Sequence, residues 1–422
     1  MINRIDLEEK NQKILALTIC AFVSYVPIIA FAKTITSFFV GEGFKIDTYI
    51  MYLLFAALLM KSSAIVSKKI KIDVIFVAFT FILAYLTTYM FFLPNSVFMF
   101  TSVTDLFSNP FYILFVFSLS GYIFTRYITH YDILNDYMIK ASILVVLGST
   151  ITYFIRLNSG VEMQYMTFSY NMTVQTIFLI IMFLEKKKIL YLLTGLVGFL
   201  MIIFAGARGP LISILVVSFI FLIFRKALLL RKITLLTLMI LLLGLVSRFF
   251  QDILFFLIEL SEKVGISSRT LQSILNNTMF YDSGRGDIQE KIINSYTVLG
   301  LGLYGDRVAS GGSYAHNFFI EVMSQFGYAF GPIVIGVVLV IILNGVLSKN
   351  NEIRNLATIF LSTGFIKLLL SGSYLNQEPA FYILLALGVN ALCQQKGIKN
   401  EDTVVMQYNV AKSSRRHIKK NK

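Results

Sequence analysis

The stretch FGYAFGPIVIGVVLVIILNGVL (326–347) contains no charged residue. A helix of about 20 apolar residues crosses the hydrocarbon core of a bilayer, which is about 30 Å thick. This stretch therefore predicts a membrane-spanning helix. The rest of the chain resembles it in composition, because 57% of the 422 residues are hydrophobic and only 14% are charged. A soluble domain is about 25% charged, so we expect one all-α, polytopic integral membrane protein.

The same length criterion, applied to the rest of the chain, predicts about twelve transmembrane helices. They are 14–32, 48–66, 72–93, 110–126, 141–157, 168–184, 189–206, 210–224, 233–250, 326–347, 355–372 and 380–394. The first follows basic residues, as a signal peptide would, but Lys33 stands where a cleavage site needs small residues. We therefore expect it to remain as an uncleaved span. An even number of spans places both termini on one side of the membrane.

The lysines and arginines concentrate in alternate loops, and this asymmetry predicts the orientation of the chain. With the N-terminal tail (1–13) in the cytoplasm, the loops on that side are basic, and the short loops on the other side are almost free of Lys and Arg. Topology therefore explains most of the net charge of +14. The C-terminal tail (395–422) is then cytoplasmic and basic, and anionic lipid attracts it. We do not expect nucleic acid as a partner.

The segment 251–316 is the long loop of this plan and lies on the outer side. It separates nine spans within 14–250 from three spans within 317–394. Its apolar residues recur at helical spacing after Ser268, which predicts one short helix. Asp287 and Glu290 form the pattern of a capping box, which predicts the start of a second helix. The glycines of VLGLGLYGD (298–306) are expected to end that helix.

Arginines gather in the segments that we expect outside. Arg208 lies in AGARGP (205–210), and Arg285 stands between two glycines in YDSGRGDIQEK (281–291), just before a predicted helix. The N–H groups at a helix start favour an anion, and the planar guanidinium suits phosphate. Snorkelling of Arg208 to the interface and a simple turn at Arg285 are the structural alternatives. The remaining outer arginines are Arg248, Arg269 and Arg307.

This cationic set predicts an anionic ligand at the outer face. A lipid diphosphate fits, because its charge lies at the level of the headgroups and its apolar tail lies among the spans. Lys61 and Lys367 fall within predicted spans, where they either snorkel or line a cavity. The sequence leaves these two interpretations open.

A candidate proton acceptor follows the glycine-rich part of 300–331. His316 begins a predicted helix there, and histidine exchanges a proton near neutral pH. Glu321 lies four residues after Asn317, so the two share one helical face. A structural role for His316 is the alternative interpretation.

Several functional classes lack their motifs in this chain. It contains no Walker motif, no HExxH, no GxSxG and no spacing of metal ligands. The predicted spans also lack the acidic residues of a proton relay. We therefore expect neither a metal nor a cofactor.

Three pieces, taken in order, give the chain its family resemblance. They are GARGPLISIL (206–215), SGRGDIQEKIINSYTVLGLGLYG (283–305) and AHNFFIEVMSQFGYAFG (315–331). The chain resembles the O-antigen polymerase and ligase superfamily of bacterial envelope polysaccharide enzymes. The plan of twelve spans with one large outer loop late in the chain extends the resemblance.

The resemblance implies a metal-independent glycosyltransferase of the bacterial inner membrane, acting at its outer, periplasmic face. Its donor would be an oligosaccharide linked to undecaprenyl diphosphate, and a chain-length regulator protein is a candidate partner. Arg208 and Arg285 would bind the diphosphate, and His316 would assist at the acceptor or the leaving group. Arg248 and Arg269 are weaker candidates for the diphosphate, and Glu321 is a weaker catalytic candidate.

Three functions remain open at this point. The first is a polymerase that transfers a growing glycan onto a lipid-linked repeat unit in O-antigen or capsule synthesis. The second is an O-antigen ligase that transfers the glycan to lipid A–core. The third is a flippase or other transporter of lipid-linked oligosaccharides, which also has about twelve spans but needs cationic residues within the spans and toward both faces.

Overall fold

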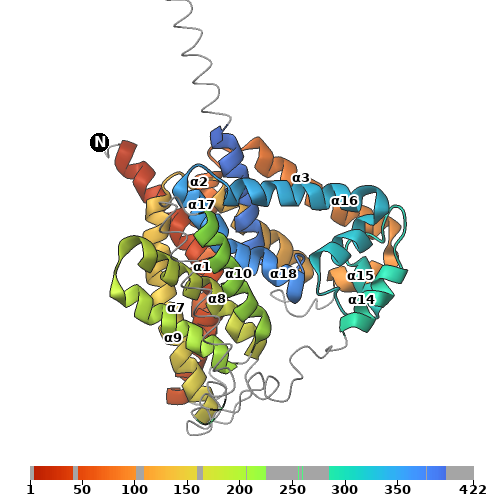
Figure 1. Ribbon diagram of the computed structural model, residues 1–422. Helices are drawn as coiled ribbons and strands as arrows, with labels where there is room; N and C mark the ends of the chain where they lie inside the picture. The colour runs from red at the N-terminus through yellow and green to blue at the C-terminus, as the bar shows by residue number, and fades with distance from the viewer. Residues whose placement is uncertain are drawn as a thin grey trace, which may run out of the picture.

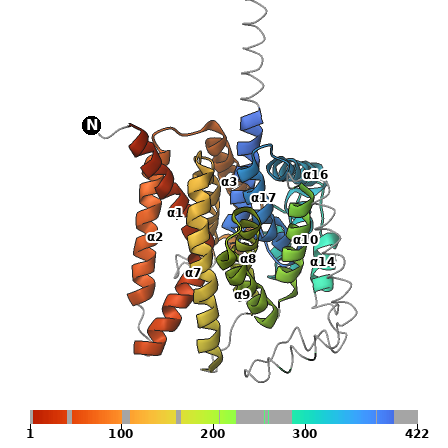
Figure 2. The ribbon, with the colours of Figure 1, turned by 60° about the vertical axis from the view of Figure 1, so that its left-hand side comes forward.

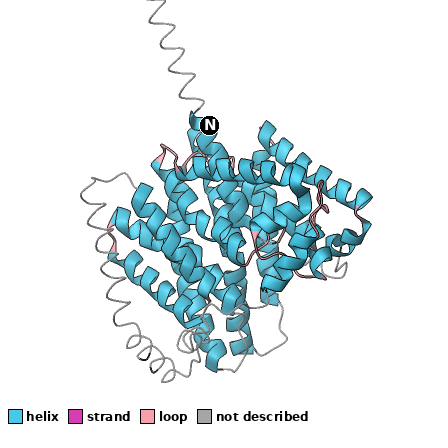
Figure 3. Ribbon diagram, turned by 45° about the vertical axis from the view of Figure 1, so that its right-hand side comes forward, coloured by secondary structure: helices cyan, strands magenta, loops and turns pink. Residues whose placement is uncertain are grey.

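A computed structural model describes residues 4–40, 46–100, 109–158, 165–205, 207–224, 255, 259, 285–376 and 378–395. These residues are almost entirely helical, and no β-strand occurs among them (Figure 3). The expected all-α class is therefore confirmed for this part of the chain.

The helices follow one another along the chain with short connections between most of them. They are α1 (Arg4–Val40), α2 (Ile46–Val66), α3 (Ile72–Phe91), η1 (Leu93–Asn95), α4 (Ser96–Phe100), α5 (Pro110–Tyr112), η3 (Ile113–Ser118), α6 (Leu119–Thr125), α7 (Tyr131–Asn158), α8 (Tyr165–Lys186), α9 (Ile189–Ala205), α10 (Arg208–Phe224), α14 (Arg285–Asn294), α15 (Gly305–Ser310), α16 (Phe318–Val346), α17 (Asn351–Leu361), η4 (Ser362–Ile366), α18 (Lys367–Leu370) and a C-terminal helix, Pro379–Gln395.

Six helices among the described residues are long and apolar enough to cross a membrane. They are α1, α3, α7, α8, α16 and the continuous run Asn351–Leu370. Shorter apolar helices are Ile50–Val66, Pro110–Thr125, Ile189–Ala205, Arg208–Phe224 and Pro379–Gln395. Each predicted span except 233–250 falls on one of these helices, and 233–250 lies outside the described residues, as do Arg248 and Arg269.

The outer surfaces of α3 and α16 are the clearest sign of a lipid environment. Phe76 and Phe79 of α3 are 69% and 60% exposed, and Ile333 and Val337 of α16 are 61% and 54% exposed. Contiguous apolar faces of this kind are unfavourable in water, because soluble proteins rarely expose large apolar patches. The apolar helices thus fit a protein embedded in a membrane.

Several helices extend beyond the apolar runs that predicted them. α1 covers Arg4–Val40 around the predicted span 14–32, and α16 begins at Phe318, before the predicted span 326–347. The side chain of Asn317 explains the early start of α16, since it accepts hydrogen bonds from the N–H groups of Phe319 (2.9 Å) and Ile320 (3.3 Å). Hydropathy measures the apolar part of a helix, whereas capping decides where the helix begins.

Both described ends of the chain lie on one side of the helix bundle, at the top of Figures 1 and 2. We call this the termini side and the opposite side the far side. A buried ion pair closes the termini side: Arg126 is 4% exposed and its Nη2 lies 3.0 Å from Asp73 Oδ1. Tyr122 donates to the same carboxylate, and Asn390 donates to the carbonyl of Thr125 at 3.0 Å. A buried ion pair is stable only when hydrogen bonds complete it, as they do here.

In the predicted loop 251–316, the second predicted helix is present as α14. It begins at Arg285, two residues before Asp287, so Asp287 lies in the first turn and not at the predicted cap. It ends at Asn294, before the glycines that were expected to end it. The helix predicted after Ser268 lies outside the described residues.

The glycines at 300 and 302 belong instead to a segment, 297–302, that passes alongside a break in α16. At Gly327 the backbone leaves the helical conformation, with φ 66° and ψ −173°. Backbone hydrogen bonds connect residues 297–302 to both sides of the break: Tyr328 N to Thr297 O (3.2 Å), Ala329 N to Val298 O (2.9 Å), Leu301 N to Ser324 O (2.8 Å) and Gly302 N to Gln325 O (3.0 Å). A bilayer offers no water to such groups, so a broken helix needs these partners.

We predict that Gly327→Ala destabilises the protein by about 2–4 kcal/mol, the sum of backbone strain and overpacking. An added Cβ would lie 2.2 Å from Gly300 N and 2.4 Å from Val298 O, and φ is positive at this residue. Gly336→Ala on the same helix is the control, because its Cβ would meet nothing within 4 Å. Thermal denaturation in detergent should show a lower midpoint for Gly327→Ala alone. Equal midpoints for the two variants would contradict the close packing of residues 297–302 against the break at Gly327.

Candidate anion-binding site

Tyr170 of α8 is the centre of a polar cluster where α8, the start of α10 and the end of α18 meet. Its side chain is 5% exposed, and its hydroxyl accepts a hydrogen bond from Ser371 Oγ at 2.8 Å. The start of α10 packs against the same hydroxyl, because a Cβ on Gly209 would lie 2.0 Å from Tyr170 Oη. Only glycine allows so close an approach. Arg208, the half-buried first residue of α10, directly precedes this glycine.

Arg285, the first residue of α14, reaches the cluster from the segment between α10 and α16. Its Nη1 donates to the carbonyl of Leu370 at 2.6 Å, at the C-terminal end of α18, where a cation is favourable. The next residue, Ser371, accepts at its carbonyl from Tyr314 Oη at 3.0 Å. The C-terminal end of α18 therefore orients the guanidinium of Arg285. Through Ser371 it also connects Tyr314, in the segment before α16, to Tyr170.

His316 lies in that segment, half-buried, with the left-handed φ of 54°. Its ring centroid is 4.0 Å from that of Tyr314. Burial lowers the pKa of His316 first, the positive charge of Arg285 lowers it further, and a backbone hydrogen bond with Ser371 opposes both. The imidazole is therefore neutral near pH 7. Nδ1 is buried and has no hydrogen-bond partner within the described part of the chain, so it can accept a proton.

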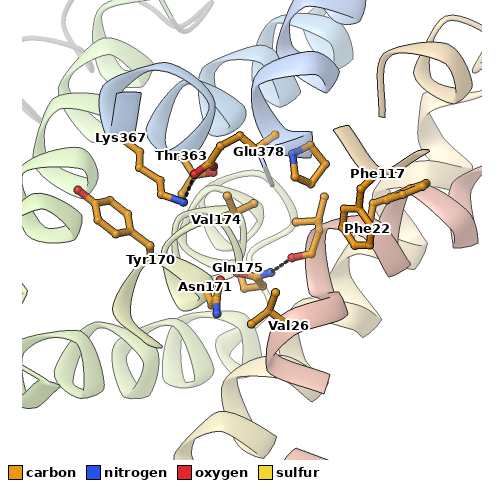
Figure 4. Close-up of a pocket in the computed structure, with 13 residues that line it drawn as sticks. Phe22, Val26, Phe117, Tyr170, Asn171, Val174, Gln175, Thr363, Lys367 and Glu378 are labelled. Atoms are coloured by element: carbon orange, nitrogen blue, oxygen red, sulfur yellow. Dashed lines mark hydrogen bonds and ion pairs between the residues drawn. The ribbon is translucent and has the colours of Figure 1, made fainter. Parts of the chain in front are cut away.

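Lys367 of α18 forms the inner side of the cluster (Figure 4). Its Nζ lies 5.3 Å from the centroid of the Tyr170 ring and forms an ion pair with buried Glu378. Both line a cavity of about 60 Å³ together with Asn171, Gln175 and Thr363. Such a volume holds a few water molecules, since each needs about 10–15 Å³ on this measure.

The two lysines that the sequence left open therefore differ in position. Lys367 lines a cavity, whereas Lys61 lies exposed on α2.

Glu321 belongs to a separate buried network. It is 0% exposed, and its Oε1 accepts hydrogen bonds from Ser373 Oγ and from Gln325 Nε2. Gln325 Nε2 also donates to Asp306 Oδ1 at 3.3 Å, and burial raises the pKa of Asp306. Asn317, predicted to share a face with Glu321, instead caps α16.

Arg307 is also part of the interior. It is 9% exposed, its Nη2 donates to Asn376 Oδ1 at 2.7 Å, and its guanidinium lies 4.3 Å from the centroid of the Tyr304 ring. Of the predicted outer cations, the structure places Arg285 at the cluster and holds Arg307 in a structural contact, and Arg208 stands next in sequence to Gly209, which packs on Tyr170. Arg248 and Arg269 are not among the described residues.

Sequence reasoning missed Tyr170, Ser371 and Glu378. A signal for the first was present, because Tyr170, Asn171 and Gln175 place polar groups on adjacent turns of an otherwise apolar helix. Ser371 and Glu378 had no such signal, since they stand in the connection between two apolar helices.

The cluster combines Arg208, Arg285 and Lys367 with one carboxylate, a phenol and a neutral imidazole. Such a set can bind a multiply charged anion and accept a proton. Within the described residues, no group of three or more His, Cys, Asp or Glu side chains stands together to hold a metal ion.

Comparison with known proteins provides no relative: no protein-family model, no curated protein and no solved structure matches the chain. What the site binds must therefore follow from its own residues.

We predict that Arg285→Gln raises the pKa of His316, because the substitution removes the positive charge that lowers it. The pKa should remain below that of an exposed histidine, since burial is the larger cause and is unchanged. NMR of ¹⁵N-histidine-labelled protein measures this titration, and loss of the signal in His316→Asn assigns it. An identical titration in wild type and Arg285→Gln would show that the two side chains do not interact.

Proposed function

We propose that the chain is a membrane glycosyltransferase whose donor is a glycan linked to polyprenyl diphosphate. The observation that supports this best is that Arg285 and Lys367 meet at Tyr170, next to a neutral His316, while α10, which begins at Arg208, packs on the same phenol through Gly209. The cluster lies in an apolar helical bundle. In the proposed topology of twelve spans with cytoplasmic termini, the far side of the bundle is periplasmic, and 251–316 is the outer loop.

The charges of donor and site suit one another. A diphosphate that links a lipid to a sugar carries two negative charges, which two guanidinium groups can match with hydrogen-bonded contacts. The apolar tail of such a lipid would lie against the exposed apolar helices. A free nucleotide sugar has no such tail and would not need a site of this kind at a membrane.

The proposed reaction is a displacement at the anomeric carbon of the donor. The acceptor hydroxyl oxygen bonds to that carbon while the bond from the carbon to the diphosphate oxygen breaks, and the electron pair stays on the diphosphate. The hydroxyl proton passes to the imidazole of His316, which then releases it to water. A positioned base of this kind contributes about 10²–10⁴-fold in rate, and the preorganised cations stabilise the charge that develops on the leaving group.

The remaining candidates have smaller parts in this proposal. Glu321 is buried with its hydrogen-bonded neighbours, which favours a role in supporting the start of α16 over one in proton transfer. Arg248 and Arg269 stay proposed contacts of the diphosphate.

Among the three functions considered, we favour a polymerase of O-antigen or capsule at the outer face of the bacterial inner membrane. A ligase would use the same donor half of the site with lipid A–core as acceptor. A flippase would need cations within the spans and toward both faces. The resemblance of the sequence motifs supports the first two, and the gathering of Arg208 and Arg285 on one side argues against the third.

We predict that Arg208→Ala, Arg285→Ala and His316→Asn each abolish long surface polysaccharide chains in a deletion strain that expresses the variant. Asn is chosen at 316 because it tolerates the left-handed backbone there. Gel electrophoresis of surface polysaccharide reads the result, with immunoblotting to confirm equal protein levels. Lys61→Met is the control, since Lys61 is exposed and lies on α2.

The deletion strain itself separates the three functions. Loss of a polymerase leaves lipid A–core with a single repeat unit, loss of a ligase leaves none attached, and loss of a flippase blocks export of the repeat unit. Normal chain lengths in both Arg285→Ala and His316→Asn would overturn the proposed site.

A further inference from the structure

The ion pair of Lys367 and Glu378 lies on the inner side of the cluster, and the reaction described so far gives these two residues no role distinct from that of the arginines. The side chains are 21% and 9% exposed. Removing two charges from water costs several kcal/mol per ion, and an apolar pair of similar volume is often equally stable or more stable. Stability alone therefore does not explain why a lysine and a glutamate occupy these positions.

Two features of its surroundings, the π-helical turn before it and the cavity beside it, favour a functional role for Lys367 next to Tyr170. Lys367 follows η4, a π-helical turn over Ser362–Ile366, and such turns are frequent at functional sites. Thr363 Oγ1 and Gln175 Oε1 also line the cavity and are buried with no hydrogen-bond partner among the described residues. These polar groups suit water molecules that hydrate the ion pair from its inner side.

The proposed reaction changes the charge that this cluster must hold. The donor diphosphate carries two negative charges, matched by Arg208 and Arg285, whereas the released diphosphate carries a third on the oxygen that leaves the sugar. A cation is therefore needed more by the leaving group than by the bound donor. Lys367, 5.3 Å from the Tyr170 ring, supplies that cation on the inner side of the cluster.

We propose that Lys367 is a catalytic residue that stabilises the third negative charge of the leaving diphosphate, and that Glu378 is the positioning residue that holds its ammonium beside Tyr170. This inference rests on the proposed function and names one more group for it. An ammonium has three N–H donors, so Lys367 can donate to the phosphate oxygen and keep its bond to Glu378. No proton leaves Lys367, and the hydroxyl proton still passes to His316.

The direct test is turnover by the purified full-length protein with lipid-linked repeat units, followed as chain growth on a gel. Lys367→Met should lower kcat about 10²–10³-fold, the cost of removing one preorganised group that stabilises developing charge. The KM for the donor should change little, because the arginines match the charge of the ground state. Lys61→Met should retain wild-type turnover. Unchanged kcat in Lys367→Met would overturn the inference.

A charge exchange separates this role from that of a structural ion pair. Lys367→Glu combined with Glu378→Lys restores opposite charges in the cavity but moves the cation away from its place on α18. We expect the double variant to recover the thermal midpoint lost in Lys367→Glu alone, without recovering turnover. Recovered turnover would show that only the ion pair matters and would overturn the inference.

Failure of the proposed function would look different. Wild-type protein that neither binds nor elongates lipid-linked repeat units would overturn the glycosyltransferase proposal, and this inference with it. An active wild type with a fully active Lys367→Met overturns the role of Lys367 alone.

Discussion

The buried hydroxyl of Tyr170 is the contact on which the candidate site depends. Ser371 donates to it at 2.8 Å, and Gly209 lets the backbone of α10 approach it more closely than any side chain would allow. Three helices distant in sequence, α8, α10 and α18, therefore meet at one phenol. Two cations reach the site as a consequence: Lys367 is carried there by α18, and Arg285 is held there by its hydrogen bond to the carbonyl of Leu370. Arg208 begins α10, the helix that packs on the phenol.

In two further places of the same bundle, buried polar groups are paired by hydrogen bonds from distant parts of the chain. On the termini side, Arg126 is buried because Asp73 and Asn390 complete its hydrogen bonds. In α16, the break at Gly327 is possible because residues 297–302 supply partners to the freed backbone groups.

The fold could be predicted from the sequence to a large extent, because hydropathy reports which segments are apolar over the length of a helix. The predicted spans lie on helices wherever the structure describes them. Helix starts were less predictable: Asn317 extends α16 and α14 begins before Asp287, since capping depends on single hydrogen bonds. The glycines at 300 and 302 suggest a helix stop in the sequence, whereas in the structure both have positive φ, with Gly300 packed against α16 and Gly302 packed against Phe92 and Thr88 at the end of α3.

The site was predictable only in part. Arg208, Arg285 and His316 could be selected because charged or titratable groups at helix starts near a membrane are unusual. Tyr170, Ser371 and Glu378 could not be paired with them, because no local pattern reports which connection meets which helix. The burial of Glu321 was not predictable for the same reason: its spacing from Asn317 indicates a helical face, while the tertiary packing that buries this carboxylate is not encoded in that spacing.

The central claim is that the cluster around Tyr170 binds a lipid diphosphate through its cations. The most direct measurement is the affinity of the purified protein in detergent for farnesyl diphosphate and for farnesol, in wild type and in an Arg208→Ala/Arg285→Ala double variant. The account predicts that wild type binds the diphosphate at least about tenfold more tightly than the alcohol, a difference of 1.4 kcal/mol, and that the double variant loses this preference. Equal affinity of wild type for both ligands would contradict it.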